Sequence, residues 1–254
     1  MLFYQNYFTL AKEMTLSDFK LRYHGSLLGV FWSFLRPMAL FAVLYIVFSV
    51  FIRFDIPHYP LYLLLGIILW NFFSEATLLS LNNLAGKAAL IKKIPFPRSI
   101  IIVSATCTVF LTLLMNLAVF FIFFAFSSLK FSWTMLLAPV FIIELYFISL
   151  GTSLFISALY AKFKDIRYIW EVTLQLIFWI SPIIYSIEMI PQKFHFAVYL
   201  NPLTRIIQYT REALLLEKIP NLDGMTALSL MTLFIVFFGY IIFKKRSPYF
   251  AEEL

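Results

Sequence analysis

Long apolar runs, separated by short breaks that carry the charges and prolines, most limit how this 254-residue chain can fold. A run of about 20 apolar residues is long enough to cross a membrane as a helix. Five runs meet this standard, near 61–82, 99–126, 134–160, 168–189 and 225–243. A sixth, near 35–52, qualifies if the Arg36 side chain extends back to the interface. We therefore predict an all-α integral membrane protein, with one transmembrane domain over 1–254 and six spans.

The composition points to lipid as part of the solvent. Hydrophobic residues make up 62% of the chain and charged residues only 13%, against about 25% in an ordinary soluble domain. The net charge of +7 would suit a nucleic acid, but the basic residues are spread between apolar runs. This distribution favours a membrane surface and no nucleic-acid partner. Cys107 is the single cysteine, so an intrachain disulfide is excluded, and the N-terminal residues do not resemble a signal peptide.

The positions of lysine and arginine predict the orientation. With the N-terminus inside, 14 of the 20 basic residues fall in cytoplasmic segments and 6 in outer segments. Short cytoplasmic loops of membrane proteins carry an excess of Lys and Arg. We therefore expect both termini in the cytoplasm.

The segment 194–216 is too polar to be a seventh span. Burying Arg205, Arg211 and Glu212 in lipid would cost roughly 2.5–3.5 kcal/mol each. We predict instead a re-entrant segment that dips in from the outer side between spans five and six. Asn201 suits a helix N-cap and Pro202 a first turn, so that Asn201, Pro202, Arg205 and Arg211 would form an outer gate. An amphipathic helix resting on the outer leaflet is the alternative.

The N-terminal part predicts a helix that lies on the cytoplasmic face. Thr15 and Asp18 resemble a capping box, and basic residues alternate with apolar ones after it. This pattern favours an amphipathic interface helix near 15–29, which bends at the two glycines of GSLLG, 25–29. The small-xxx-small spacing of these glycines would also let helices approach closely.

Four segments occur together in a recognisable order: LRYHGSLLGVFWSFLRP, LIKKIPFPRS, KDIRYIWEVTLQLIFWISPIIY and LNPLTRIIQYTREALL. As an ordered set they resemble the membrane-spanning permease subunit of a bacterial ABC exporter, of the polysaccharide and O-antigen type in the type-two export family. The resemblance covers nearly the whole chain. It implies a multi-pass protein of the bacterial inner membrane that exports a glycan, commonly on a polyprenyl diphosphate carrier.

The same resemblance implies the partners. Two copies would form a homodimer with the channel between them, and a separate ATPase dimer would carry ATP and Mg, while this chain binds no cofactor. The loop around IKKIPFP would contact the ATPase or gate the inner mouth. Asp165, among basic neighbours, would be salt-bridged in a second docking loop. The predicted docking or gating residues are Lys92, Lys93, Pro95, Pro97, Arg98, Lys164, Asp165 and Arg167.

The chain lacks the motifs that ATP hydrolysis or metal catalysis requires. Its one Gly-Lys pair, Gly86–Lys87, is followed by Ala88, and Leu81 stands where a phosphate-binding loop begins with glycine. The three histidines fall in separate segments, which argues against a metal site. We therefore expect a transport subunit and not an enzyme.

Three acidic residues in or near the apolar runs keep other functions open. Glu75, Glu144 and Glu171 would suit a proton-coupled secondary transporter, although the two halves of the chain show no repeat. For Glu144 we expect a structural hydroxyl partner on a neighbouring span. An ABC exporter of teichoic acid, lipid or a drug is a further alternative. A membrane enzyme would need a carboxylate pair or a metal motif.

Aromatic residues make up 20% of the chain and could stack on sugar rings. Packing between spans and interface belts explain most of them. The candidates for the transport path are Tyr45, Trp70, Trp179 and Tyr185. Arg36, at the inner interface, is the candidate for contact with the diphosphate head group of a lipid carrier, and contact with ordinary anionic membrane lipid is the alternative.

Overall fold

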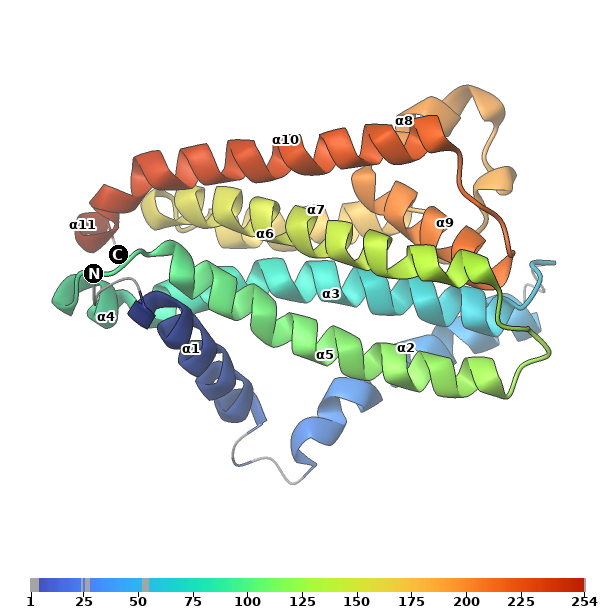
Figure 1. Cartoon of the computed structure of the whole chain (residues 1–254), viewed down its shortest axis with the longest axis horizontal. Coiled ribbons are helices and arrows are strands. Elements are labelled where there is room, and N and C mark those ends of the chain that lie inside the picture. The colour runs from blue at the N-terminus through green and yellow to red at the C-terminus, as the bar shows by residue number, and fades with distance from the viewer. Residues whose placement is uncertain (1–4, 24, 26–27, 52–54, 254) are drawn as a thin grey trace.

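The computed structural model describes residues 5–23, 25, 28–51 and 55–253, and within these ranges it is helical and without β-strands. The expected all-α class is thus confirmed. The longer helices form an elongated bundle (Figure 1). The helices are α1 (Gln5–Tyr23), α2 (Trp32–Tyr45) with a π-helical continuation (Ile46–Phe51), α3 (Tyr59–Gly86), α4 (Ala88–Lys93), α5 (Ser99–Ala125), α6 (Ala138–Lys162), α7 (Ile166–Ile180), α8 (His195–Tyr199), α9 (Pro202–Leu215), α10 (Leu222–Arg246) and α11 (Phe250–Glu253).

Five helices in the described part of the chain are long and apolar enough to cross a membrane. They are Trp32–Phe51, Tyr59–Gly86, Ser99–Ala125, Trp133–Lys162 and Leu222–Glu253. These five correspond to the predicted spans at 35–52, 61–82, 99–126, 134–160 and 225–243. The sequence therefore identified each of the membrane-length helices.

The predicted helical span at 168–189 is wrong in its second half. Helix α7 has 15 residues, or about 22 Å at about 1.5 Å per residue, whereas a bilayer core is about 30 Å thick. The helix ends at Ile180 because Ser181 precedes Pro182, and a residue before proline is driven out of the helical region. Ser181 accordingly adopts an extended conformation, with ψ at 137°. A non-helical stretch then leads to a short 3-10 turn, Ile187–Met189.

The start of α1 lies at the same end of the bundle as α4 and α11 (Figure 1). Phe243 and Phe250 pack there in one cluster with Leu84, Ile91 and Ile101. Helix α6 ends at this cluster, whereas α10 begins at the opposite end. Residues 163–221 must therefore carry the chain from one end to the other. Helix α7 and its non-helical extension supply that passage.

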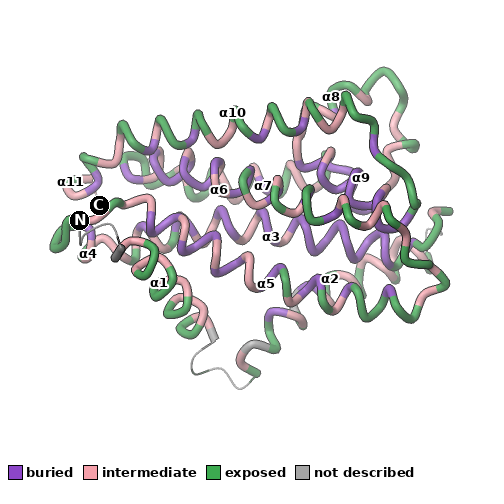
Figure 2. The backbone as a smooth tube through the Cα atoms, viewed as in Figure 1, coloured by how far each residue is buried: buried purple, intermediate pink, exposed green. Residues whose placement is uncertain are grey.

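Helix α3 occupies the centre of the bundle, as Figure 2 shows by its buried colouring. Every residue from Leu61 to Trp70 is buried, and α3 contacts α2, α5, α6, α7 and α9. A helix that is apolar on all sides finds partners only when other helices surround it. Helices α2 and α10 lie at the periphery and leave much apolar surface exposed. Such surface is compatible with lipid or with a further protein subunit.

Two glycines set the close crossing of α6 and α10. A Cβ atom added to Gly151 would lie 2.8 Å from the Cα of Val236 on α10, and one added to Gly239 would meet the carbonyl of Gly151. The small-residue contact thus lies here and not at Gly25 and Gly29. Those two glycines have positive φ angles, 75° and 50°, between the end of α1 and the start of α2. They serve the predicted bend.

The N-terminal helix begins ten residues before the predicted start at 15 and ends at Tyr23, before the predicted end at 29. Thr15 and Asp18 lie within it and form no capping box. The Thr15 hydroxyl donates to the carbonyl of Ala11 at 2.8 Å, four residues back along the helix. The Asp18 carboxylate accepts from Lys87, the residue directly after α3, at 2.6 Å. The capping pattern was misread because the same residues also suit a helix interior that faces a partner.

Candidate functional site

The two predicted docking loops lie at the end of the bundle that holds α4 and α11 (Figure 1). Helix α4 and the residues after it leave Lys92, Lys93, Pro95 and Pro97 exposed, and Arg98 is half-buried. The exposed side chain of Ile94 adds an apolar contact to this loop. Helix α11 packs on α4 and α6, so the C-terminal residues brace the region.

The second loop, from Lys162 to Arg167, lies beside the first. The Lys164 ammonium group donates to the carbonyls of Ala161 and Glu253, each at 3.1 Å. Partial burial lowers the pKa of Lys164, the Glu253 charge raises it, and the Lys92 charge lowers it. Because Lys92 belongs to the first loop and Lys164 to the second, the charges of the two loops affect each other. We call the exposed residues of 92–98 and 162–167 the basic loop surface. Its mixture of cationic and apolar side chains is typical of a protein-contact surface.

The expected salt bridge of Asp165 is wrong: in the described part of the chain Asp165 forms no ion pair with Lys162, Lys164 or Arg167. The Arg167 guanidinium instead pairs with Glu171, one helical turn on in α7, at 3.2 Å. A pair at i and i+4 is geometrically easier on a helix than one that bends back to the N-cap residue. Asp165 remains exposed before α7, and the helix has no side-chain cap there. This carboxylate therefore belongs to the basic loop surface as an accessible charge.

At the opposite end, Arg211 is fully enclosed, with 1% of its surface exposed. Its guanidinium donates to the carbonyls of Tyr62, Pro182 and Ile183 at 2.9, 2.6 and 2.7 Å. The guanidinium carbon also lies 3.4 Å from the centroid of the Tyr62 ring. The carbonyls of Pro182 and Ile183 have no helical N–H partner because α7 ends before them. Arg211 therefore supplies the donors that a continuing helix would have provided.

Tyrosines complete the attachment of the non-helical stretch after α7. The Tyr59 hydroxyl donates to the Ile184 carbonyl, and the Tyr62 hydroxyl to the Tyr185 carbonyl, both at 3.1 Å. The Tyr185 hydroxyl itself donates to the Trp179 and Ile180 carbonyls at the end of α7. Backbone that leaves a helix inside a membrane protein needs such partners. These contacts hold residues 179–185 against α3 and α9.

The start of α9 matches the prediction. The Asn201 side chain accepts from the backbone N–H of Leu203 at 3.0 Å and donates to the Ser181 hydroxyl at 2.8 Å. Pro202 stands in the first turn. Arg205 is only half-buried and donates to the Tyr199 carbonyl at 2.7 Å. Asn201 is therefore confirmed as the N-cap, and Arg205 and Arg211 differ in how deeply they are enclosed.

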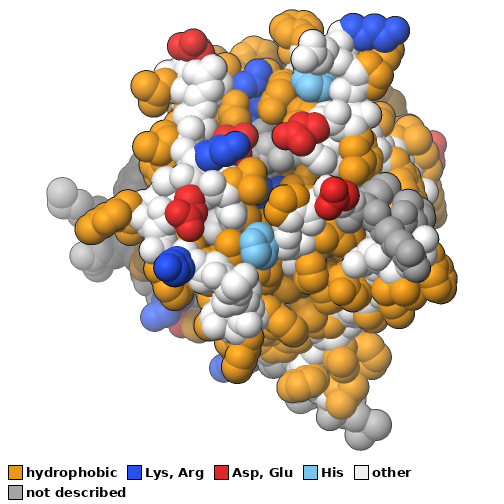
Figure 3. Space-filling view, turned by 90° about the vertical axis from the view of Figure 1, so that its right-hand side faces the viewer, with side chains coloured by type: hydrophobic (Ala, Val, Ile, Leu, Met, Phe, Trp, Pro, Cys, Tyr) orange, Lys and Arg blue, Asp and Glu red, His pale blue; other side chains and the backbone are white. Residues whose placement is uncertain are grey.

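Helix α9 packs against α3, α6 and α10, so both of its faces are largely buried. Figure 3 shows this end of the molecule, where charged side chains of both signs lie among hydrophobic ones. A cavity of about 400 Å³ opens there. Its lining residues are Tyr199, Arg205, Tyr209, Glu212, Asn221, Asp223, Gly224 and Ala227.

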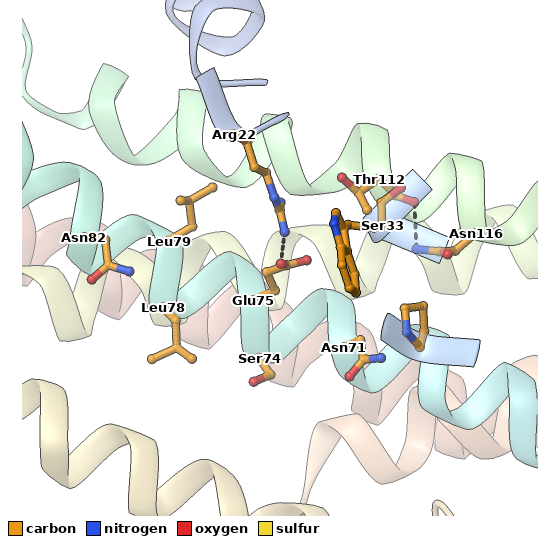
Figure 4. Close-up of a pocket in the computed structure, with 12 residues that line it drawn as sticks. Arg22, Ser33, Asn71, Ser74, Glu75, Leu78, Leu79, Asn82, Thr112 and Asn116 are labelled. Carbon is orange, nitrogen blue, oxygen red and sulfur yellow. Dashed lines mark hydrogen bonds and ion pairs between the residues drawn. The ribbon is translucent and has the colours of Figure 1, made fainter. Parts of the chain in front are cut away.

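A second cavity, of about 480 Å³, lies between α1, α2, α3 and α5 (Figure 4). Arg22 of α1 forms an ion pair with Glu75 of α3 across it. Its walls are polar for a site between membrane-length helices. The lining residues are Arg22, Trp32, Ser33, Pro37, Asn71, Ser74, Glu75, Leu78, Leu79, Asn82, Thr112 and Asn116.

The four aromatic candidates for the path lie in different surroundings, and none is among the described residues that line the 480 Å³ cavity. Trp70 is 6% exposed and packs on Phe178, with ring centroids 5.6 Å apart. Trp179 is 60% exposed on α7, and Tyr185 is half-buried. Tyr45 stacks on Phe41 within α2.

The structure describes the predicted acidic residues but not the side chain of Arg36. Glu144 accepts from the Ser229 hydroxyl of α10 at 2.6 Å, so the expected hydroxyl partner is confirmed. Glu75 and Glu171 each pair with an arginine. All three carboxylates thus have structural partners.

Sequence reasoning missed the polar wall of the 480 Å³ cavity. Asn71, Glu75 and Asn82 recur at helical spacing in α3, and Thr112 and Asn116 lie four residues apart in α5. This periodicity of polar residues within apolar runs was the available signal. The signal was missed because the apolar segments were assessed only for their length.

Comparison with known proteins gives one consistent picture. Residues 9–215 match the family model described as ABC-2 type transporter. The chain is 31% identical to the O-antigen export system permease protein RfbA of Klebsiella pneumoniae, over 97% of this chain and 95% of that protein. It is 23% identical to RfbA of Myxococcus xanthus, over 93% and 92% of the two chains. It is 24% identical to the polysialic acid transport protein KpsM of Escherichia coli, over 93% of each.

Proposed function

Because the chain belongs to the ABC-2 type transporter family, we propose that it is the permease subunit of an ATP-driven exporter that moves a polysaccharide across the bacterial inner membrane. The observation that carries this proposal is the 31% identity to an O-antigen export permease over 97% of the chain. The similarity extends through the basic loops, the non-helical stretch after α7 and α9. A lipid-linked glycan of the O-antigen type is the substrate class that this relative favours.

A separate ATPase would supply the energy and bind the basic loop surface. The phosphate-binding motif is missing from the sequence, as shown above. The two loops present exposed lysines, prolines and the apolar side chains of Ile94 and Phe163 at one end of the bundle. Helix α4 is short and lies between the long helices α3 and α5 in the chain, so movement at this surface would be transmitted into the bundle.

A second copy of the chain would complete the transport path. Helix α2 has few buried residues, and α7 exposes a broad apolar face that includes Tyr168, Val172 and Trp179. Either lipid or another protomer must cover these faces. A homodimer that joins them would place exposed aromatic side chains such as Trp179 along a path between protomers, where sugar rings could stack on them.

The proposed topology has six membrane passages and cytoplasmic termini. The sixth passage is α7 with its non-helical extension, which runs the length of the bundle. Helices α8 and α9 would form the re-entrant segment, since α9 is enclosed by α3, α6 and α10 and carries a buried arginine. A helix that rested on the outer leaflet would leave its polar face in water.

Charge reversal on the basic loop surface tests the ATPase contact. We expect K92E/K93E/R98E to abolish co-purification with the ATPase subunits and stimulation of ATP hydrolysis, because three cationic contacts become repulsive. Affinity purification and phosphate release measure the two effects. Reversal of Lys130, on the loop between α5 and α6 at the other end, is the matched control. If the triple variant assembles, hydrolyses ATP and exports normally, this surface is not the docking site.

A further inference from the structure

The 480 Å³ cavity contains two buried polar atoms that have no partner in the described part of the chain. Thr112 and Asn116 are 4% and 7% exposed, and both line the cavity from α5. The Thr112 hydroxyl and the Asn116 carbonyl oxygen form no hydrogen bond there. The Asn116 amide nitrogen is used, since it donates to the Thr112 backbone carbonyl at 3.1 Å (Figure 4). Buried polar atoms are normally satisfied by protein, water or a bound group, so these two atoms are left for a water molecule or a ligand.

The groups around these atoms form one polar wall. Figure 4 shows Asn71, Ser74 and Glu75 on α3, across the cavity from Thr112 and Asn116. Asn82 continues the same wall on α3, and Arg22 reaches in from α1 to pair with Glu75. The volume lies within the range of about 300–1,000 Å³ that is typical of small-molecule sites. The cavity is therefore large enough for more than isolated water.

The charge balance of the wall selects against an anion. Arg22 is the one cationic side chain among the described lining residues, and it is paired with Glu75. A phosphate or diphosphate would lie close to the Glu75 carboxylate without a second cation to offset its charge. Phosphate sites instead gather arginines, lysines or helix N-termini. The remaining polar groups are carboxamides and hydroxyls, which are uncharged.

Carboxamides and hydroxyls both donate and accept hydrogen bonds, as do the hydroxyl groups of a sugar. Trp32, Leu78 and Leu79 also line the cavity and offer apolar surface to the C–H faces of a sugar ring. We propose that this cavity binds an uncharged saccharide unit of a membrane-borne glycolipid, with Thr112 and Asn116 as ligands to its hydroxyl groups. The proposal that this unit belongs to the exported glycan rests on the proposed function.

The described lining residues lie on α1, α2, α3 and α5. Arg22, near the end of α1, and Trp32, at the start of α2, both belong to this lining. A head group could enter sideways from the membrane while its acyl or prenyl chain stays in lipid. The Arg22–Glu75 pair would close one side of the site.

Native mass spectrometry of the full chain purified with its ATPase subunits tests this proposal. The probes are glucosyl-diacylglycerol, diacylglycerol without the sugar, and phosphatidylglycerol. We expect the wild-type complex to retain glucosyl-diacylglycerol at least about tenfold better than diacylglycerol, as two added hydrogen bonds would allow. T112V and N116L should lower that retention to the diacylglycerol level. N71L on the facing wall gives a second, independent variant should either α5 variant fail to fold.

Thr106→Val is the matched control. Thr106 is also fully buried on α5, but its hydroxyl already donates to the carbonyls of Ile102 and Val103 at 3.1 and 3.0 Å. The Thr106→Val variant should therefore leave glycolipid retention unchanged. Equal retention of all three lipids would show that the cavity holds water, and preferred retention of phosphatidylglycerol would show an anion site; either result overturns the proposal. Since the readout is binding, failure of ATPase coupling or of export would be seen separately.

Discussion

An Arg211→Ala variant is expected to lose about 3–5 kcal/mol of folding free energy, enough to prevent accumulation of folded protein. The substitution removes the guanidinium donors to the carbonyls of Tyr62, Pro182 and Ile183 and leaves a cavity beside Gly66. Water cannot readily replace these donors in an enclosed site. The expected observation is a strongly reduced yield of monodisperse protein in detergent, with a lowered thermal unfolding midpoint.

Two further substitutions separate this explanation from a general need for arginine. Arg211→Lys should be nearly as damaging, because a single ammonium group cannot reproduce the planar guanidinium that reaches three carbonyls and lies on the Tyr62 ring. Arg205→Ala, six residues earlier on the same helix, should cost only about 1 kcal/mol because Arg205 is half-buried. Wild-type stability of Arg211→Ala would contradict the structural role of this residue.

Gly151→Leu is expected to have the second largest effect, a loss of about 3 kcal/mol or more together with loss of export. Even a Cβ atom at this position would lie 2.8 Å from the Val236 Cα and 2.9 Å from the Ile235 carbonyl. Backbone atoms cannot rotate away as a flexible side chain can, so α10 must move off α6. Helix α10 packs mainly on α6, and the variant should therefore lower the unfolding midpoint sharply.

Gly86→Ala supplies the control for Gly151. Nothing lies within 4 Å of a Cβ atom at Gly86, which ends α3. Its replacement should change stability by less than about 1 kcal/mol, in the stabilising direction expected for alanine in a helix. If Gly151→Leu retained the wild-type unfolding midpoint, the close contact of α6 and α10 would not be needed for the bundle.

The membrane-length helices were predictable because hydrophobicity over about 20 residues has one main explanation. The end of α7 was missed although the signal was present: Pro182 follows Ser181 within an otherwise apolar run. Length and composition dominated that reading, whereas the local geometry of proline decided the outcome. The start of α1 was missed because a local signal was given too much weight. Thr15 and Asp18 suit a helix cap, but they suit a tertiary contact within a helix equally well.

The candidate site was only partly predictable. The basic loops are short, charged and bounded by long helices, so their position at an end of the bundle followed from topology. Asn201 as N-cap followed from local chemistry. The enclosure of Arg211 depends on carbonyls of Tyr62, Pro182 and Ile183, which no local pattern links to residue 211. The ion pair of Arg22 and Glu75 likewise depends on the docking of α1 on the bundle.

Deletion of the gene in the native bacterium tests the central proposal most directly, with the glycan measured on the cell surface and inside the inner membrane. We predict that the surface polysaccharide disappears while completed, lipid-linked glycan accumulates on the inner side. The wild-type chain should restore export only when the partner ATPase retains its phosphate-binding lysine. Unchanged surface polysaccharide, or its loss without internal accumulation, would contradict the assignment of this chain as a polysaccharide export permease.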